Sequence, residues 1–201
     1  AAIQAGTNLH NDAADTLNGT DCEDRLGPPR VCASGWVGTG TVLRAAHLAF
    51  LVAVLCGIYL AWQGGLPILV LGLAAVAAGY AYSAGPWPIS RTPLGEVLVL
   101  AFFGVGAVWG TAWLAGGVSH PSCPAFGAAL GALAAAVLLT NNTRDLEGDR
   151  RSGRRTLAIL AGRRRAAWIY AGLVLAPFGI VAAAAVVWPG LAGGALGLAA
   201  L

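Results

Sequence analysis

The stretch Asn141-Asn-Thr-Arg-Asp145-Leu-Glu-Gly-Asp149-Arg-Arg-Ser-Gly-Arg-Arg-Thr-Leu157 follows an apolar run and concentrates charge in an otherwise apolar chain. Asp145 and Asp149 are four residues apart, a spacing that places side chains on one face of a helix. Two carboxylates this close repel each other unless a cation lies between them, and oxygen ligands suit Mg²⁺, which commonly also binds substrate phosphates. The arginines present planar forks that match phosphate oxygens. The stretch therefore predicts half of a site for a Mg²⁺-bound diphosphate ester, although an ordinary basic loop beside a membrane span fits it equally well in isolation.

The composition indicates a membrane protein. Hydrophobic residues make up 57% and charged residues 10% of the 201 residues, and the mean hydropathy is +0.71. A soluble globular domain carries about 25% charged residues. The net charge of +3 says little by itself, and no nucleic-acid partner is expected.

Five charge-free apolar runs are candidates for membrane spans, since crossing ~30 Å of hydrocarbon takes about 20 helical residues. They are residues 45–62, 64–82, 97–113, 124–140 and 166–188. We expect a truncated span before Asn8 and another after Leu191, because the chain opens and stops inside apolar pattern and contains no Met. The runs predict an all-α, polytopic transmembrane helical bundle, in a chain that lacks both natural ends.

The connections between these runs alternate between charged and uncharged. Residues 11–44, 83–96 and 141–165 hold every Arg, Asp and Glu of the protein, and the links between them hold none. Arginine and lysine mark the cytoplasmic side of membrane proteins. All three charged segments are therefore predicted on the cytoplasmic side of the cell membrane.

A second constellation near the N-terminus has a similar layout. Asn8 and Asp12 are four apart and Asp15 is three beyond, so one helical face presents an amide and two carboxylates. Asn18–Gly19 then signals a turn. Further charged residues follow that turn, namely Asp21, Arg25 and Arg30. Alone, this segment fits a solvated helix end capped by aspartates equally well.

Together the two constellations are more specific than either alone. Each places acids just beyond a predicted span, each has an amide (Asn8 or Asn141) one turn before its first aspartate, and each is followed by arginine. Two facing carboxylate sets could hold one or two Mg²⁺ ions bridged by diphosphate. Such a site suits a reaction whose leaving group is diphosphate, because metal and arginine stabilise charge on the departing oxygens. Apolar helices in lipid would lodge an isoprenoid tail.

The middle charged segment offers residues for a second substrate. Tyr82 ends one predicted span and Glu96 begins the next. Both could orient or deprotonate an aromatic acceptor. For Glu96, the favourable placement of an acid at a helix N-terminus is an equally good explanation.

At these residues the chain resembles the UbiA superfamily of intramembrane prenyltransferases, and within it the 1,4-dihydroxy-2-naphthoate polyprenyltransferases of menaquinone synthesis. The resemblance rests on three stretches: Asn8-Leu-His-Asn-Asp12-Ala-Ala-Asp15, Tyr82-Ser-Ala-Gly-Pro-Trp-Pro88 with Leu94-Gly-Glu96, and Asn141-Asn-Thr-Arg-Asp145 with Asp149. Two departures stand out. Arg154 occupies a position where family members usually have Lys, and Ala13 and Ala14 stand where larger side chains are common.

The resemblance implies transfer of a polyprenyl group from polyprenyl diphosphate to 1,4-dihydroxy-2-naphthoate, with loss of CO₂ and diphosphate to give demethylmenaquinone. It implies a single UbiA-like domain over residues 1–201 that lacks the first helix and the C-terminal end of the bundle. The implied Mg²⁺ ligands are Asp12, Asp15, Asp21, Asp145 and Asp149. The implied substrate-binding residues are Asn8, Asn141, Arg25, Arg30, Arg144 and Arg154. Glu96 and Tyr82 would serve the aromatic acceptor.

Alternatives stay open at this point. The same fold could act on 4-hydroxybenzoate or homogentisate, or the chain could be a non-enzymatic cation-binding membrane protein. A CDP-alcohol phosphotransferase is disfavoured, because that class needs an Asp-Gly-x-x-Ala-Arg stretch and no aspartate here is followed by one.

Overall fold

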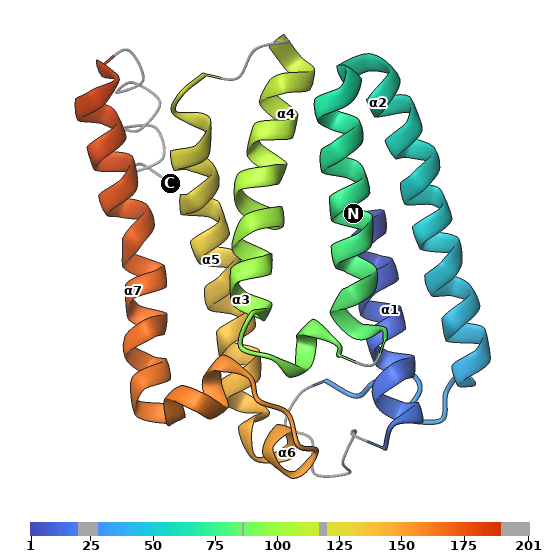
Figure 1. Ribbon diagram of the computed structural model, residues 1–201. Helices are drawn as coiled ribbons and strands as arrows, with labels where there is room; N and C mark the ends of the chain where they lie inside the picture. Colours follow the sequence, from blue (N-terminus) through green and yellow to red (C-terminus); the bar gives the residue numbers. More distant parts are fainter. Residues whose placement is uncertain (20–27, 86, 117–119, 190–201) are drawn as a thin grey trace. The chain divides into compact units, whose positions relative to one another are not determined.

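A computed structural model of the protein describes residues 1–19, 28–85, 87–116 and 120–189. Over these residues the secondary structure is helical throughout, without a strand, so the prediction of an all-α protein is confirmed (Figure 1). The elements are α1 (Ala2–Leu17), α2 (Thr39–Ser83), the 3₁₀ helix η1 (Ile89–Arg91), α3 (Gly95–Val99), the π-helical η2 (Leu100–Gly106), α4 (Ala107–Gly116), α5 (Cys123–Arg144), α6 (Leu146–Arg151) and α7 (Leu157–Val187).

The chain forms two compact units. Unit 1 comprises residues 1–95 and 140–163, and unit 2 comprises residues 96–139 and 164 onward. Unit 1 therefore contains the described parts of all three charged segments apart from Glu96, Arg164 and Arg165. Segments that are remote in sequence thus belong to one compact body.

Four helical stretches are long and apolar enough to cross a membrane, namely α2, Gly95–Gly116, α5 and α7. The 45 residues of α2 form a hairpin of two arms, because Gly65 turns the chain with φ 70° and ψ −159° (Figure 1). A positive φ of this kind favours glycine. The arms correspond to the predicted spans 45–62 and 64–82, so the sequence located this turn correctly. The chain is thus a multi-pass membrane protein; the expected span after Leu191 lies outside the described residues.

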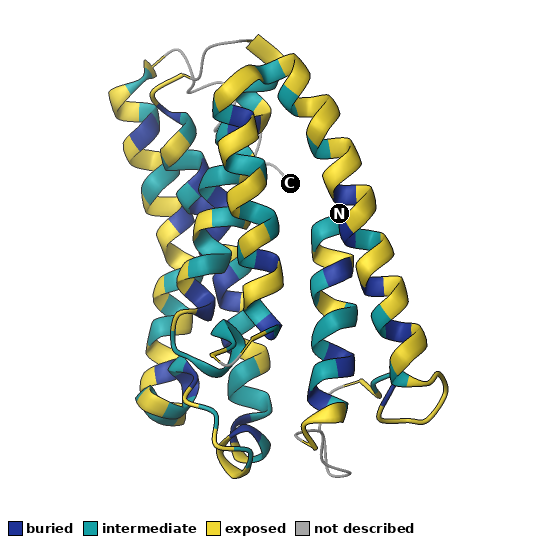
Figure 2. Cartoon of the chain, turned by 45° about the vertical axis from the view of Figure 1, so that its right-hand side comes forward, coloured by how far each residue is buried: buried dark blue, intermediate teal, exposed yellow. Residues whose placement is uncertain are grey.

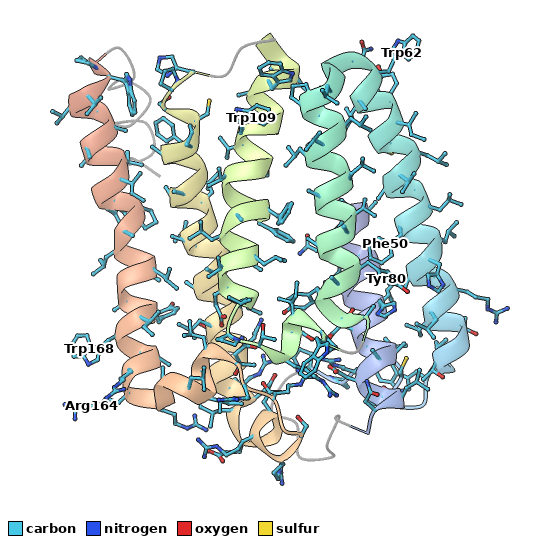
Figure 3. The ribbon with its side chains drawn as sticks, in the orientation of Figure 1. Phe50, Trp62, Tyr80, Trp109, Arg164 and Trp168 are labelled. Carbon is cyan, nitrogen blue, oxygen red and sulfur yellow. The ribbon has the colours of Figure 1, made fainter. Side chains whose placement is uncertain are left out.

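The spanning helices expose their apolar surface. Only 17% of the most apolar stretch of α2 and 11% of that of α7 is buried within the protein, and Figure 2 shows long exposed runs along α2. The exposed side chains include Leu48, Leu55, Ile58 and Leu73, and Trp62 beside the α2 turn is 87% exposed (Figure 3). A water-soluble monomer rarely exposes so large an apolar surface. This surface suits contact with lipid chains, where a helix is stable because its backbone N–H and C=O groups are hydrogen-bonded within the helix.

The helix α1 packs closely against both arms of α2 through two glycines. A Cβ on Gly79 would lie 2.8 Å from Ile3 Cγ2, and one on Gly6 would lie 3.0 Å from Phe50 Cδ2. Thr7 Oγ1 donates a hydrogen bond to the Gly79 carbonyl at 3.2 Å. Small residues allow such close approach of helices in membranes. The packing fixes the apolar half of α1, and thereby the aspartates one to two turns further along.

In unit 2, α5 packs against the backbone of η2 through two further glycines. A Cβ on Gly131 would lie 2.5 Å from the Leu100 carbonyl oxygen, and one on Gly127 would lie 2.6 Å from Val105 Cα. In both cases the obstructing atom belongs to the backbone, so no side-chain rotation can relieve the clash. The α5–η2 contact therefore requires glycine at these positions.

We expect Gly131→Ala to lower the free energy of unfolding by about 1–3 kcal/mol, the usual range for overpacking a tight contact. Thermal unfolding of the purified protein in detergent would measure it. Gly57→Ala is the matched control, because a Cβ there meets nothing within 4 Å and alanine favours the helix. Equal melting temperatures for Gly131→Ala and Gly57→Ala would contradict the close contact.

Candidate functional site

The buried carboxylate of Asp15 gathers three side chains in unit 1. Arg30 Nη1 donates to Asp15 Oδ2 at 2.6 Å, Arg154 Nη2 donates to Asp15 Oδ1, and Asn11 Nδ2 donates to Asp15 Oδ2 at 3.2 Å. The Asp15 side chain is 6% exposed. Two cations thus meet at one acid of the first motif, and one of them comes from the second motif.

The guanidinium of Arg154 also contacts the second aspartate motif. Its Nη1 lies 3.3 Å from Asp149 Oδ1 while its Nη2 binds Asp15. A single side chain therefore joins the carboxylates of Asp15 and Asp149, which are 134 residues apart in sequence. The two motifs that the sequence predicted to act together are linked by this contact.

The turn after α6 explains why Arg154 reaches Asp149. Gly153 has φ 73° and donates its N–H to the Arg150 carbonyl at 3.1 Å, and the Arg154 N–H bonds the Asp149 carbonyl at 3.0 Å. This pair of bonds, with glycine in the left-handed region, is the Schellman arrangement that ends many helices. It reverses the chain at the end of α6, so the side chain of Arg154 returns to contact Asp149.

The charge of Arg154 is firmly maintained. Burial by itself would lower the pKa of its guanidinium, but the nearby carboxylates of Asp15 and Asp149 outweigh burial, and the net effect raises the pKa. Tyr82 contributes in the same direction, so it lies within electrostatic reach of Arg154. Arg154 therefore stays cationic throughout the pH range in which proteins fold.

Asp12 presents one oxygen for a further partner. Its Oδ2 accepts a hydrogen bond from the Cys32 backbone N–H at 3.4 Å, whereas Oδ1 is buried and has no hydrogen-bond partner among the described residues. The Nε of Arg154 is likewise buried without a partner within the described part of the chain. Buried polar atoms are nearly always hydrogen-bonded. An acceptor on the first motif and a donor on the second thus remain for a ligand.

Asp145 is placed differently from Asp149. It lies between α5 and α6, and both of its oxygens accept hydrogen bonds from the adjacent Arg144, at 2.9 and 2.8 Å. The α-helix is interrupted at this residue, although the Asp149 N–H still bonds the Asp145 carbonyl at 2.9 Å. The backbone hydrogen bond expected between residues four apart on a helix is therefore kept across the helix break.

The remaining predicted site residues are distributed as follows. Asn8 and Asn141 are exposed. Glu96 is buried at the start of α3 and belongs to unit 2. Asp21 and Arg25 lie outside the described residues.

Two supporting contacts were not anticipated from the sequence. Asn11 supplies an amide beside Asp15, and Arg30 additionally donates to the Asn11 carbonyl at 3.3 Å. The Arg155 backbone N–H bonds the Arg91 carbonyl at 2.9 Å and so joins the middle segment to the second motif. Asn11 was visible as a residue four before Asp15, but the backbone bond has no sequence signal.

The donor set fits a Mg²⁺ ion shared with a substrate better than one held by protein alone. Over the described ranges, no group of three His, Cys, Asp or Glu side chains is close enough to hold a metal ion. Mg²⁺ commonly binds through one or two carboxylates together with substrate phosphates. The Asp12 oxygen that has no partner among the described residues and the buried carboxylates of Asp15 and Asp149 supply oxygen ligands of that kind.

The chain shows clear similarity to known proteins. The model of the UbiA prenyltransferase family matches residues 1–201. The chain is 34% identical to the 1,4-dihydroxy-2-naphthoate octaprenyltransferase of Mycobacterium tuberculosis, over 86% of this chain and 59% of that protein. It is 33% identical to the protein of the same name from Escherichia coli, over 86% of this chain and 58% of that protein. A more distant relative, the digeranylgeranylglyceryl phosphate synthase of Thermococcus kodakarensis, is 32% identical over 71% of this chain and 50% of that protein.

The chain spans between half and three fifths of the length of these relatives. No solved structure matches it significantly.

Proposed function

Because the chain belongs to the UbiA prenyltransferase family, we propose that its protein transfers a polyprenyl group from polyprenyl diphosphate to 1,4-dihydroxy-2-naphthoate within the membrane. The products would be demethylmenaquinol (the hydroquinone form of demethylmenaquinone), CO₂ and diphosphate. The names of the relatives in Mycobacterium tuberculosis and Escherichia coli support the choice of acceptor. The more distant relative is named for a different product, digeranylgeranylglyceryl phosphate.

The observation that carries the proposal is the bridge made by Arg154 between Asp15 and Asp149. It brings both aspartate motifs to one place, as a diphosphate clamp requires. An arginine has five N–H donors in a rigid fork. Two carboxylates take the Nη groups of Arg154, and its buried Nε–H has no partner among the described residues, so it can donate to a phosphate oxygen.

One or two of the buried carboxylates, together with the diphosphate, would hold a Mg²⁺ ion, which would supply charge neutralisation for the leaving group. The candidate ligands are Asp12, Asp15 and Asp149, of which one or two would bind the ion at a time, with Asp145 and Asp21 as further candidates. Arg30 and Arg154 would contact the phosphates, Arg144 would orient Asp145, and Asn8 and Asn141 would reach the phosphates from their exposed positions. Donors fixed beforehand cost no reorganisation when charge develops, which is why such sites accelerate reactions.

The aromatic acceptor would approach from the side of Tyr82, which lies within electrostatic reach of Arg154. Glu96 remains a candidate for orienting the acceptor. We propose that the site faces the cytoplasm, because the arginine-rich segments that build it are those that the distribution of charge assigns to that side.

The complete protein, purified in lipid nanodiscs, is expected to transfer a radiolabelled prenyl group to dihydroxynaphthoate only with a divalent cation present. Chelation with EDTA should abolish the product, and added Mg²⁺ should restore it. Asp12→Asn should lower turnover by about 10²-fold, the loss typical of a removed electrostatic contact. Glu147→Gln is the control, because Glu147 is an exposed acid whose one ion pair among the described residues is with Arg150, at 3.7 Å.

A competition assay decides the acceptor. Dihydroxynaphthoate, 4-hydroxybenzoate and homogentisate would be offered together, and the prenylated products separated. Predominant prenylation of either of the other acids would assign the fold to that acceptor. Cation-independent turnover, or full turnover by Asp12→Asn, would contradict the proposed clamp.

A further inference from the structure

A cavity of about 450 Å³ lies in unit 1 beside α1, apart from the aspartates. Its walls come from the end of α1, the second arm of α2 and the loop that leads through η1. The residues used below are His10, Ala14, Tyr80, Ser83 and Arg91. None of them belongs to the proposed diphosphate clamp. Pockets for small molecules are typically 300–1,000 Å³ in volume, so the cavity suits a compact ligand such as a bicyclic aromatic acid.

The polar wall of the cavity is ordered by contacts within the protein. His10 Nδ1 and Ser83 Oγ are 2.9 Å apart and hydrogen-bonded, which ties α1 to the end of α2. The ring of Tyr80 lies 5.4 Å from that of His10, centroid to centroid, and 6.1 Å from that of Phe50 on the other arm of α2. Figure 3 shows Phe50 and Tyr80 side by side. The wall thus offers an aromatic ring and hydrogen-bonding groups in fixed positions.

Arg91 supplies the cation of the cavity. It ends η1, and its carbonyl accepts the Arg155 N–H, so its backbone is anchored to the segment that carries Arg154. Its side chain makes no ion pair or hydrogen bond within the described part of the chain. A half-buried guanidinium without a counter-charge favours an anionic ligand, and its planar fork matches a carboxylate.

The cavity adjoins the diphosphate clamp. On α1, His10 and Ala14 are four residues apart and share one helical face, while Asp12 and Asp15 lie on another face of the same two turns. The Arg91–Arg155 backbone bond joins the other side of the cavity to the Arg154 segment. A ligand in the cavity would therefore lie next to the substrate held by the aspartates.

We propose that this cavity binds the aromatic carboxylic acid acceptor, with its carboxylate on Arg91, its ring against Tyr80 and a ring hydroxyl on the His10–Ser83 pair. The inference deepens the proposed function and rests on it. It assigns the carboxylate to a residue outside the diphosphate clamp, so the two substrates would be recognised by separate cations. Dihydroxynaphthoate, 4-hydroxybenzoate and homogentisate all carry the carboxylate that Arg91 would bind.

The test measures binding and turnover separately, using the complete protein in nanodiscs. Equilibrium dialysis would give the affinity of wild type and Arg91→Gln for 1,4-dihydroxy-2-naphthoate and for 1,4-naphthalenediol, which lacks the carboxylate. Arg91→Gln should bind the acid about 10- to 100-fold more weakly, as expected for loss of a charge-assisted pair, and bind the diol as wild type does. The KM for polyprenyl diphosphate should stay unchanged.

Control variants separate this role from general effects. Arg44→Gln removes an exposed arginine whose side-chain hydrogen bonds, among the described residues, go to Gly40 and Thr41 on its own helix, and it should leave acid binding unchanged. Arg91→Lys should restore part of the affinity. Ala14→Phe, which fills the cavity from α1, should weaken acid and diol alike. Equal melting temperatures would show that the variants fold.

The outcomes distinguish the two ideas. The cavity assignment would be overturned if Arg91→Gln bound the acid as tightly as wild type, or if the wild-type protein bound no acid. Prenyl transfer to another acceptor would in that case still support a prenyltransferase. A raised KM for polyprenyl diphosphate in Arg91→Gln would also overturn it, because Arg91 would then belong to the clamp. Arg91-dependent acid binding without any prenyl transfer would support the cavity and contradict the proposed reaction.

Discussion

Replacing Arg154 by leucine is expected to lower the turnover of prenyl transfer by about 10²- to 10³-fold, the range found when one preorganised donor is removed from a site that stabilises developing charge. The change removes the side chain that joins Asp15 to Asp149, together with its buried Nε–H, which has no partner in the described part of the chain. The measurement is kcat with radiolabelled polyprenyl diphosphate at saturating acceptor.

Arg155→Leu is the matched control for this change. Arg155 is the next residue and also an arginine, but its side chain is exposed. Its backbone N–H, which donates to the Arg91 carbonyl, is kept in the leucine variant. Its turnover should stay within about twofold of wild type, as for most surface substitutions. Arg154→Lys keeps the positive charge but loses the planar fork of donors, so its turnover should lie between those of Arg154→Leu and Arg155→Leu. If Arg154→Leu and Arg155→Leu had equal turnover, the bridge would have no part in catalysis.

Asp15→Asn is expected to damage both stability and activity. Asp15 is the common acceptor of Arg30 and Arg154, whose side chains are only 18% and 11% exposed. Breaking a buried pair from one side leaves a charge uncompensated and costs about 3–5 kcal/mol. We expect a loss of that size in the free energy of unfolding, measured by denaturant titration, together with turnover reduced by about 10²-fold.

A double-mutant cycle tests whether the loss arises from the ion pair. Arg30→Gln combined with Asp15→Asn should cost less than the sum of the single changes, because contacting residues are not additive. Glu147→Gln provides the surface comparison, since an exposed pair contributes about 0–1 kcal/mol. If the losses in free energy of unfolding from the Arg30 and Asp15 changes were strictly additive, the 2.6 Å contact would contribute nothing to stability.

The architecture was largely predictable because the bilayer imposes a length on each apolar run. Residues 45–62 and 64–82 were read as two spans, and Gly65 turns the chain between them. The interior of the helices was less predictable. The π-helical η2 and the break in α7 at Gly162, with φ 73°, depend on packing and on local turns that apolar periodicity does not encode.

The candidate site was predictable in its residue types but not in its pairing. The spacing of Asp12 and Asp15 on one helix follows from helical geometry. That Arg154 meets Asp15 depends on a chain reversal at Gly153 and on a contact across 139 residues of sequence. The spacing of Asp145 and Asp149 predicts one face of a continuous helix, whereas the helix is interrupted at Asp145, which accepts hydrogen bonds from Arg144.

The bond between the Arg155 N–H and the Arg91 carbonyl has a consequence for mutational studies of this chain. Both partners are main-chain atoms, so an alanine scan would leave the bond intact and would not detect it at either position. Arg155→Pro removes the N–H itself and is the substitution that reveals the connection. Natural variation in side chains at positions 91 and 155 would likewise leave the two loops coupled, which allows the acceptor cavity to diversify while its attachment to the diphosphate clamp persists.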